Sequence, residues 1–178
     1  MCDSQLPSSV EGHDRVFISD LSSAEALEEE SVYNLLADAR FFSFGRTRRT
    51  GQLLFKTVLE KALFSSPAAC LATVRQRLKK IEDDAGPDAD KDRITLQSIA
   101  GALERIGPAN FTNDQHLLDT LRPGGFLHWD PADAADRVVI FAERIETLGF
   151  LEQNLSRDLK LKPDQIAVVH ARVRLQPG

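Results

Sequence analysis

Cysteine is scarce in this sequence, which has only Cys2 and Cys70 among its 178 residues. Two cysteines so far apart, with four scattered histidines, do not assemble a zinc site, and no structural disulfide is predicted. Long apolar runs are also missing, so no segment is expected to span a membrane. The first residues lack the basic and then apolar regions of a signal peptide, and we therefore expect a cytoplasmic location.

Motifs for phosphate and nucleophilic chemistry are missing as well. A Walker A loop needs a lysine and a hydroxyl residue after its glycines, but residues 45–51 have two glycines and no lysine. Residues 88–91 contain two aspartates, but they lie beside Gly86-Pro87. This position favours solvated charges in a loop over a magnesium-binding acidic pair at the end of a buried strand. No Gly-x-Ser-x-Gly turn occurs. The sequence predicts no catalytic residue, no cofactor and no metal, so this chain alone is not expected to be an enzyme.

The net charge of −5 argues against a domain that wraps nucleic acid by bulk electrostatics, so any such contact must come from a local patch. The best patch is a basic cluster at a glycine-flanked loop, made of Arg40, Arg46, Arg48, Arg49 and Lys56. Neighbouring Phe41, Phe42 and Phe44 can stack on bases. The alternative, which we favour for the phenylalanines, is that they fill the core while the arginines pair with residues 28–30.

Most of the chain has helical periodicity. Residues 1–14 are polar and are expected to be a disordered tail, and residues 15–122 are expected to form a helical segment. Residues 83–92 are predicted to be a charged loop, and residues 123–136 a linker that Trp129 anchors. Apolar spacing and breaker residues predict helices at about residues 22–39, 52–63, 67–81, 93–106 and 113–121.

Two of these helices have clear sequence signals. In the helix expected at residues 67–81, Ser66 can cap the first turn and Pro67 suits the first helical position. In the helix expected at residues 52–63, one apolar face should point inward, with Leu54, Phe55, Val58, Leu59 and Ala62.

The C-terminal part has a different pattern. Residues 138–142 and 166–169 are short, continuous and rich in β-branched side chains, which is typical of strands buried on both faces. Between them an apolar stripe has helical spacing, with Ile145, Leu148, Leu151, Leu155 and Leu159. This order predicts one βαβ unit of a parallel sheet within residues 137–178. The predicted fold is therefore mostly α, followed by a C-terminal α/β part.

The wording of this stretch resembles a known family. Residues 137–169 are similar to the start of the second RecA-like lobe in Swi/Snf-type helicase-like ATPases of superfamily 2, where VVIF-x-E-R-x-x-T-L-x-x-L leads to a strand ending in LHGG. Residues 62–78 resemble the helical segment that joins the two lobes in bacterial members. The pattern departs at Val169-His170-Ala171-Arg172. The resemblance thus implies interlobe helices followed by one truncated, incomplete RecA-like βαβ unit.

Intact members of that family are ATP-driven DNA translocases, and in them the turn after the first strand lies beside the nucleic-acid backbone. The resemblance therefore implies a phosphate contact at Arg144, although Ala142 replaces the usual hydroxyl residue. His170 ends the second strand and can also meet phosphate. The first hypothesis is a truncated, non-catalytic helicase-like chain that binds DNA weakly and nonspecifically, through Arg46, Arg48, Arg49, Arg144 and His170.

The rival hypothesis is a helical protein-interaction or self-association module without a nucleic-acid role. Two apolar strands with no further strand beside them leave open edges, which favours a second copy or a missing helicase portion as partner. A third and less favoured hypothesis is a small enzyme whose site the sequence does not show.

Overall fold

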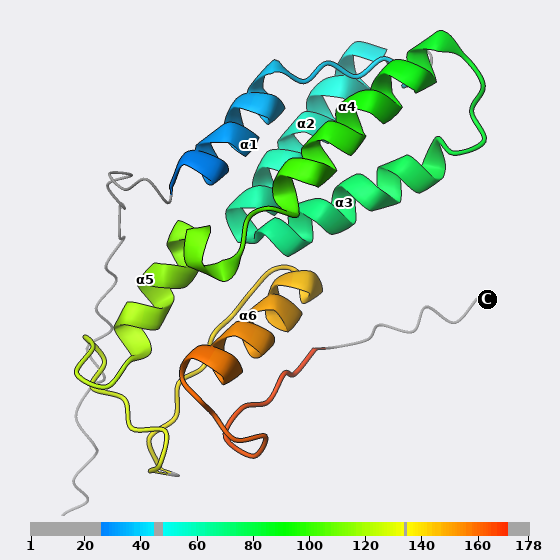
Figure 1. Ribbon diagram of the computed structural model, residues 1–178. Helices are drawn as coiled ribbons and strands as arrows, with labels where there is room; N and C mark the ends of the chain where they lie inside the picture. Colours follow the sequence, from blue (N-terminus) through cyan, green and yellow to red (C-terminus); the bar gives the residue numbers. More distant parts are fainter. Residues whose placement is uncertain (1–25, 45–47, 134, 171–178) are drawn as a thin grey trace, which may run out of the picture.

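The computed structural model of the chain describes residues 26–44, 48–133 and 135–170 (Figure 1). The expected tail at residues 1–14 lies outside these ranges. The described ranges form six α-helices and one short 3-10 helix. In chain order they are α1 (Ala26–Asp38), α2 (Arg48–Ser65), α3 (Pro67–Lys80), α4 (Pro87–Leu103), η2 (Pro108–Asn110), α5 (Thr112–Leu121) and α6 (Ile145–Asp158).

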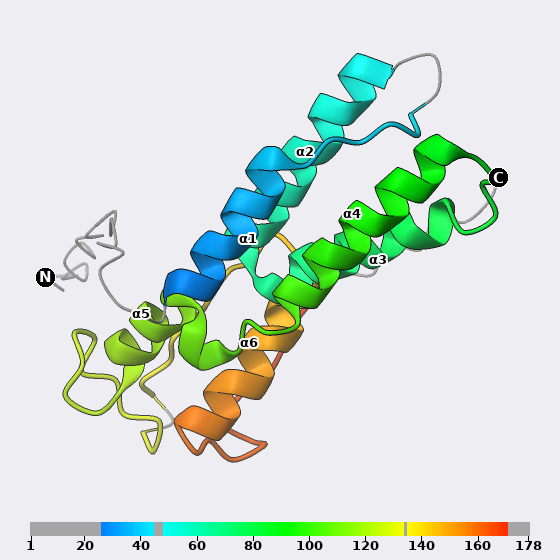
Figure 2. The same cartoon turned by 45° about the horizontal axis from the view of Figure 1, so that its top comes forward.

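Helices α1 to α4 form a bundle, in which α2 and α4 both contact α3 and α1 contacts α4 (Figure 2). Each of these helices contributes side chains to one continuous apolar core. The largest fully buried side chains of this core include Leu36, Phe41, Leu59, Leu63, Ile81, Leu96, Ile99 and Leu103. Helices α5 and α6 lie together at one end of the bundle, where α6 also contacts α3. A second, smaller apolar cluster, centred on Leu118, Leu121 and Leu155, joins these two helices.

Helix α3 begins as its sequence signals predict. The Ser66 side chain accepts a hydrogen bond from the Ala69 amide at 3.1 Å, and Pro67 occupies the first helical position. The cap satisfies one of the amides that a helix start leaves without a partner, and proline has no amide to satisfy at that point. The predicted start of this helix is confirmed.

Helix α2 is longer than predicted and presents a different face to the core. It begins at Arg48, and Leu59, Ala62 and Leu63 are fully buried in the bundle. Leu54 and Val58, which were expected to point inward, are exposed. The inward prediction was wrong for these two, because α2 packs mainly against α3 along one narrow face.

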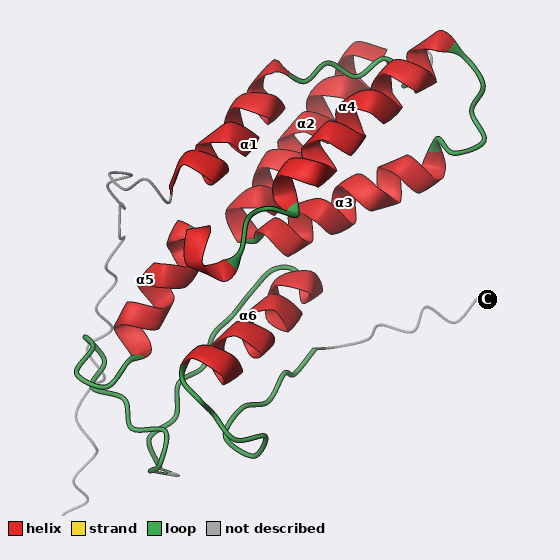
Figure 3. Cartoon of the chain, in the orientation of Figure 1, coloured by secondary structure: helices red, strands yellow, loops and turns green. Residues whose placement is uncertain are grey.

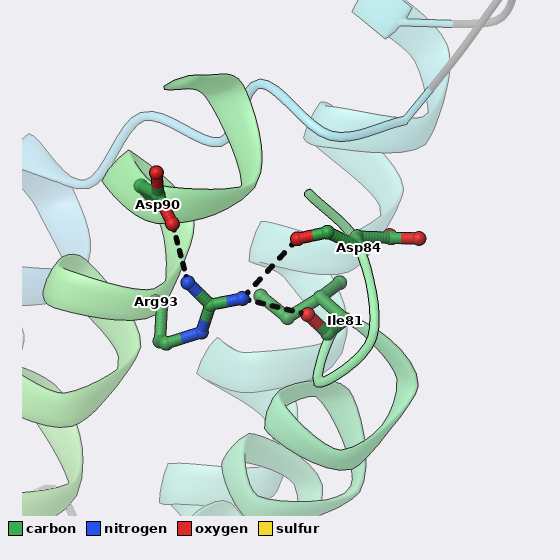
Figure 4. Close-up of polar contacts among 4 residues, drawn as sticks. All are labelled: Ile81, Asp84, Asp90 and Arg93. Atoms are coloured by element: carbon green, nitrogen blue, oxygen red, sulfur yellow. Dashed lines mark hydrogen bonds and ion pairs between the residues drawn. The ribbon is translucent and has the colours of Figure 1, made fainter. Parts of the chain in front are cut away.

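Helix α4 begins at Pro87, six residues before the predicted start at residue 93, so the predicted charged loop ends earlier than expected. Proline suits the first helical position, and Asp88 and Asp90 place negative charge in the first turn, where the helix dipole favours it. Figure 4 shows how Arg93 closes the preceding connection. Its Nη2 donates to the carbonyl of Ile81 at 3.0 Å and to that of Asp84 at 3.3 Å.

Helix α5 ends where the sequence predicts, at a turn containing Gly124 and Gly125. Gly124 has a φ of +82°, which favours glycine. A Cβ on Gly125 would lie 2.4 Å from the Asp119 carbonyl oxygen, so the close return of the chain also needs a glycine. The amide of Gly125 donates to the Arg122 carbonyl at 2.7 Å.

The predicted βαβ unit is wrong. Helix α6 is present, but residues 138–141 and 166–169 are extended segments and not strands, and Figure 3 draws no strand in the described part of the chain. Within the described ranges, no backbone hydrogen bond joins the two segments. Side chains of both, including Val138, Ile140 and Ile166, pack on the small cluster of α5 and α6 instead. These segments are therefore held by the helices and not by a RecA-like sheet.

A buried carboxylate fixes the connection between α1 and α2. Asp92 on α4 is fully buried and accepts hydrogen bonds from the backbone amides of Phe42 at 2.7 Å and Ser43 at 3.0 Å. The Ser43 hydroxyl also donates to it. From the other side, Arg77 on α3 donates to the Ser43 carbonyl at 2.6 Å. The connection between α1 and α2 thus links α3 to α4 and holds Phe41 in the core.

We expect Asp92→Ala to lower the free energy of unfolding by about 3 kcal/mol, because it leaves buried amide donors without an acceptor. Chemical denaturation of the full chain, followed by circular dichroism, measures this. The exposed Asp83 offers a matched control, since Asp83→Ala removes the same charge without removing a buried acceptor. Equal losses in the two variants would contradict the anchoring role of Asp92.

Candidate functional site

Of the predicted nucleic-acid residues, the structure describes the side chains of Arg49, Arg144 and His170, which come from different parts of the fold. Arg46 lies outside the described residues, as does the side chain of Arg48, while Arg49 is exposed near the start of α2. The other end of α2 contacts α6, where the Ser65 and Thr147 hydroxyls lie 2.7 Å apart. At 1.5 Å per helical residue, Arg49 is about 24 Å from that contact along the axis of α2.

Arg144 and His170 lie in different surroundings. Arg144 precedes α6 and is half-buried, and its Nη1 donates to the Thr73 hydroxyl at 3.4 Å. This guanidinium is therefore partly engaged in holding α6 to α3. His170 is exposed and follows the second extended segment.

The phenylalanines beside the basic cluster belong largely to the core. Phe41 is fully buried, and its ring meets Phe55 edge-on at 4.9 Å between centroids. Phe44 is half-buried under the Arg77 guanidinium, which lies 4.2 Å from its ring centroid. The core hypothesis for Phe41 is thus confirmed. Two of the three acidic residues at positions 28–30 have partners other than arginine: Glu28 accepts from Asn110 and Glu29 from Thr112.

Trp129 anchors the linker, as predicted. It packs against the small cluster of α5 and α6, and its Nε1 donates to the Asp136 carbonyl at 3.1 Å. The Asp136 carboxylate accepts from the backbone amide of Asp130 at 2.9 Å. These contacts close the linker immediately before the first extended segment.

The candidate site is an apolar groove, which we define by its two walls and its floor. Its walls are residues 138–141 and 166–169, which run along α6 in the same direction in both views (Figures 1 and 2). Its floor is apolar and consists of Leu121, Trp129, Leu148, Leu151, Leu155 and Leu159. The groove encloses about 620 Å³. Sequence analysis identified both walls but assigned them to two strands of an incomplete parallel sheet.

Exposure alternates along both walls. In the first, Val138 and Ile140 are half-buried, whereas Val139 is 71% and Phe141 92% exposed. In the second, Val168 is half-buried and Val169 is 89% exposed. Alternation with a period of two is that of extended chain, which presents successive side chains to opposite faces. The outward face of each wall is therefore apolar and open to water.

The backbone of the walls is also open. Within the described ranges, residues 138–141 and 166–169 form no backbone–backbone hydrogen bond with another described residue. Extended chain next to an apolar surface usually satisfies these groups by pairing with neighbouring chain. The groove thus offers apolar contact and backbone donors and acceptors at the same place, which suits a polypeptide ligand.

A buried carboxylate lies between the groove and the bundle. Asp114 on α5 is 1% exposed, and neither of its carboxylate oxygens has a hydrogen-bond partner among the described residues. Its pKa is raised to about 6, first by burial and then by the charge of Asp158 on α6, while Arg157 opposes the shift. Sequence analysis missed Asp114, because an acidic residue in the first turn of a helix is ordinary.

Asp114 should make stability depend on pH. The pKa of Asp114 is about 6 in the folded chain and about 3.8 in the unfolded chain. As the pH falls from 7 to 4, the folded chain therefore binds the proton at a higher pH than the unfolded chain does, and the free energy of unfolding rises. The full difference amounts to roughly 2 to 3 kcal/mol. Asp114→Asn should remove this component and stabilise the chain at neutral pH. Chemical denaturation of the wild type and of Asp114→Asn between pH 7 and pH 4 tests this prediction. An identical pH dependence of stability in the two proteins would contradict it.

The described part of the chain holds no group of three or more His, Cys, Asp or Glu placed to bind a metal ion. Among the described helices, none is both long and apolar enough to cross a membrane. No protein-family model, curated protein or solved structure matches the chain. The resemblance to Swi/Snf-type ATPases and the role in DNA binding therefore stay predictions.

Proposed function

We propose that this chain is a protein-interaction module whose apolar groove binds an extended apolar segment of another polypeptide. The observation that carries the proposal is the pair of extended walls, which line one groove along α6 and have no backbone hydrogen bond to each other. Val139, Phe141 and Val169 line the groove and are still exposed, so they add open apolar surface to it. A contiguous apolar surface of this kind marks binding sites more often than ordinary solvent-exposed surface.

The walls favour an extended occupant over a helical one. An added extended segment lies about 4.8 Å from each neighbour and pairs with its free backbone groups. A helix satisfies its own backbone groups internally and is about 10 Å wide, so it leaves those of the walls without partners. The ligand class is therefore a short stretch of β-branched or aromatic residues in extended conformation. Another protein or a second copy of this chain can supply it.

A peptide assay tests this role. A short fluorescent peptide rich in valine, isoleucine and phenylalanine should bind the full chain, as measured by anisotropy. Val139→Lys should weaken that binding about tenfold or more, because it replaces an apolar contact with a charge. Ile94 on α4 is 69% exposed and does not line the groove, so Ile94→Lys is the matched control and should bind like the wild type.

Two results would contradict the proposal. One is equal weakening by Val139→Lys and Ile94→Lys, which would indicate general attraction of the peptide to apolar surface. The other is tighter binding of a peptide of the same composition designed to be helical, since only an extended peptide can pair with both walls.

Weak, nonspecific DNA contact is a second proposal, which the exposure of Arg40 and Arg49 supports. With three or four phosphate contacts, the logarithm of the binding constant should fall with the logarithm of salt concentration with a slope of about −3 to −4. Replacing Arg46, Arg48 and Arg49 together by Ala should flatten this slope and weaken all sequences alike. Unchanged binding in the triple variant would move the contact elsewhere, with Arg144 the next residue to test.

A further inference from the structure

We infer that residues 15–20 of the same chain occupy the apolar groove, so that a partner must displace them. This inference rests on the proposed docking role of the groove. Residues 16–18, Val-Phe-Ile, are the only run of three apolar residues within residues 1–25, which precede the described part of the chain. They belong to the ligand class that the two walls favour, because β-branched and aromatic residues suit extended chain.

The length of chain before α1 is sufficient to reach the groove. The Glu29 carboxylate in the first turn of α1 accepts from the Thr112 hydroxyl at 2.8 Å, which places the start of α1 beside the start of α5. Helix α5 then runs ten residues to Leu121, a floor residue of the groove, or about 15 Å. From Ala26 back to Asp20, six extended residues span about 20 Å, and residues 16–18 reach further still.

Charge also fits this occupant. Glu152 on α6 and Arg137 both line the groove, so its edge carries one acidic and one basic group, and Arg15 before the apolar run can meet the acidic one. Residues 171–178 are the other candidate segment outside the described ranges. They continue directly from the second wall and contain no run of three apolar residues. They are therefore the poorer candidate.

Amide hydrogen exchange on the full chain tests the inference. We expect Phe17→Asp to speed the exchange of residues 138–141 and 166–169 about tenfold or more, because the local opening then costs less. Leu6→Asp, which places the same charge elsewhere in residues 1–25, should leave both walls unchanged. Amides of α3 should be unaffected in every variant. Equal exchange of the walls in wild type and Phe17→Asp would overturn the inference.

A synthetic peptide of residues 13–21 separates this inference from the proposed function. If wild type and Phe17→Asp exchange alike but the added peptide slows the walls, the groove binds extended segments, and only the role of residues 15–20 fails. If Phe17→Asp exchanges faster and the peptide has no effect, residues 15–20 contact the walls, and binding of separate chains fails. Protection of the wild-type walls that grows with protein concentration would assign the groove to a second copy and overturn the inference.

Discussion

The bundle depends on one buried carboxylate, Asp92, which has backbone amides as partners and no ion pair through its own oxygens among the described residues. A charge buried in this way is tolerated only when its lone pairs are satisfied, and two amides and a hydroxyl do so here. The same contact places Phe41 between the helices and presents the Ser43 carbonyl to Arg77. Helices α1 to α4 are therefore held together by the connection between α1 and α2 as well as by the packing of their apolar faces.

Helix α6 is held to this unit by polar contacts at its start and by apolar contacts along its length. Thr147 is buried against the Ser65 and Ser66 hydroxyls, and the Phe150 ring meets Phe111 edge-on. The groove lies on the part of α6 that this attachment leaves uncovered. A firmly held helix thus presents an apolar floor, while the walls beside it have no backbone partners among the described residues. That contrast is the physical basis of the proposed docking role.

Sequence reasoning succeeded where signals are local and failed where long-range contacts decide. The Ser66 cap and the glycines after α5 mark helix ends directly, and the apolar stripe of α6 predicted that helix. The walls of the groove have the composition of buried strands, but pairing is a long-range property that composition does not specify. Asp92 was placed in a charged loop, because its partners lie about fifty residues away. Asp114 gave no signal at all, because an acidic residue in the first turn of a helix is ordinary.

Trans-hydrogen-bond couplings in the NMR spectrum of the full chain test the central claim most directly. The claim is that residues 138–141 and 166–169 line one groove along α6 without pairing with each other, so that a third extended segment can bind there. It predicts no coupling between an amide of one wall and a carbonyl of the other, with any coupling from either wall leading to a different segment. A ladder of couplings directly from wall to wall would contradict it, because the groove would then be a closed pair of strands.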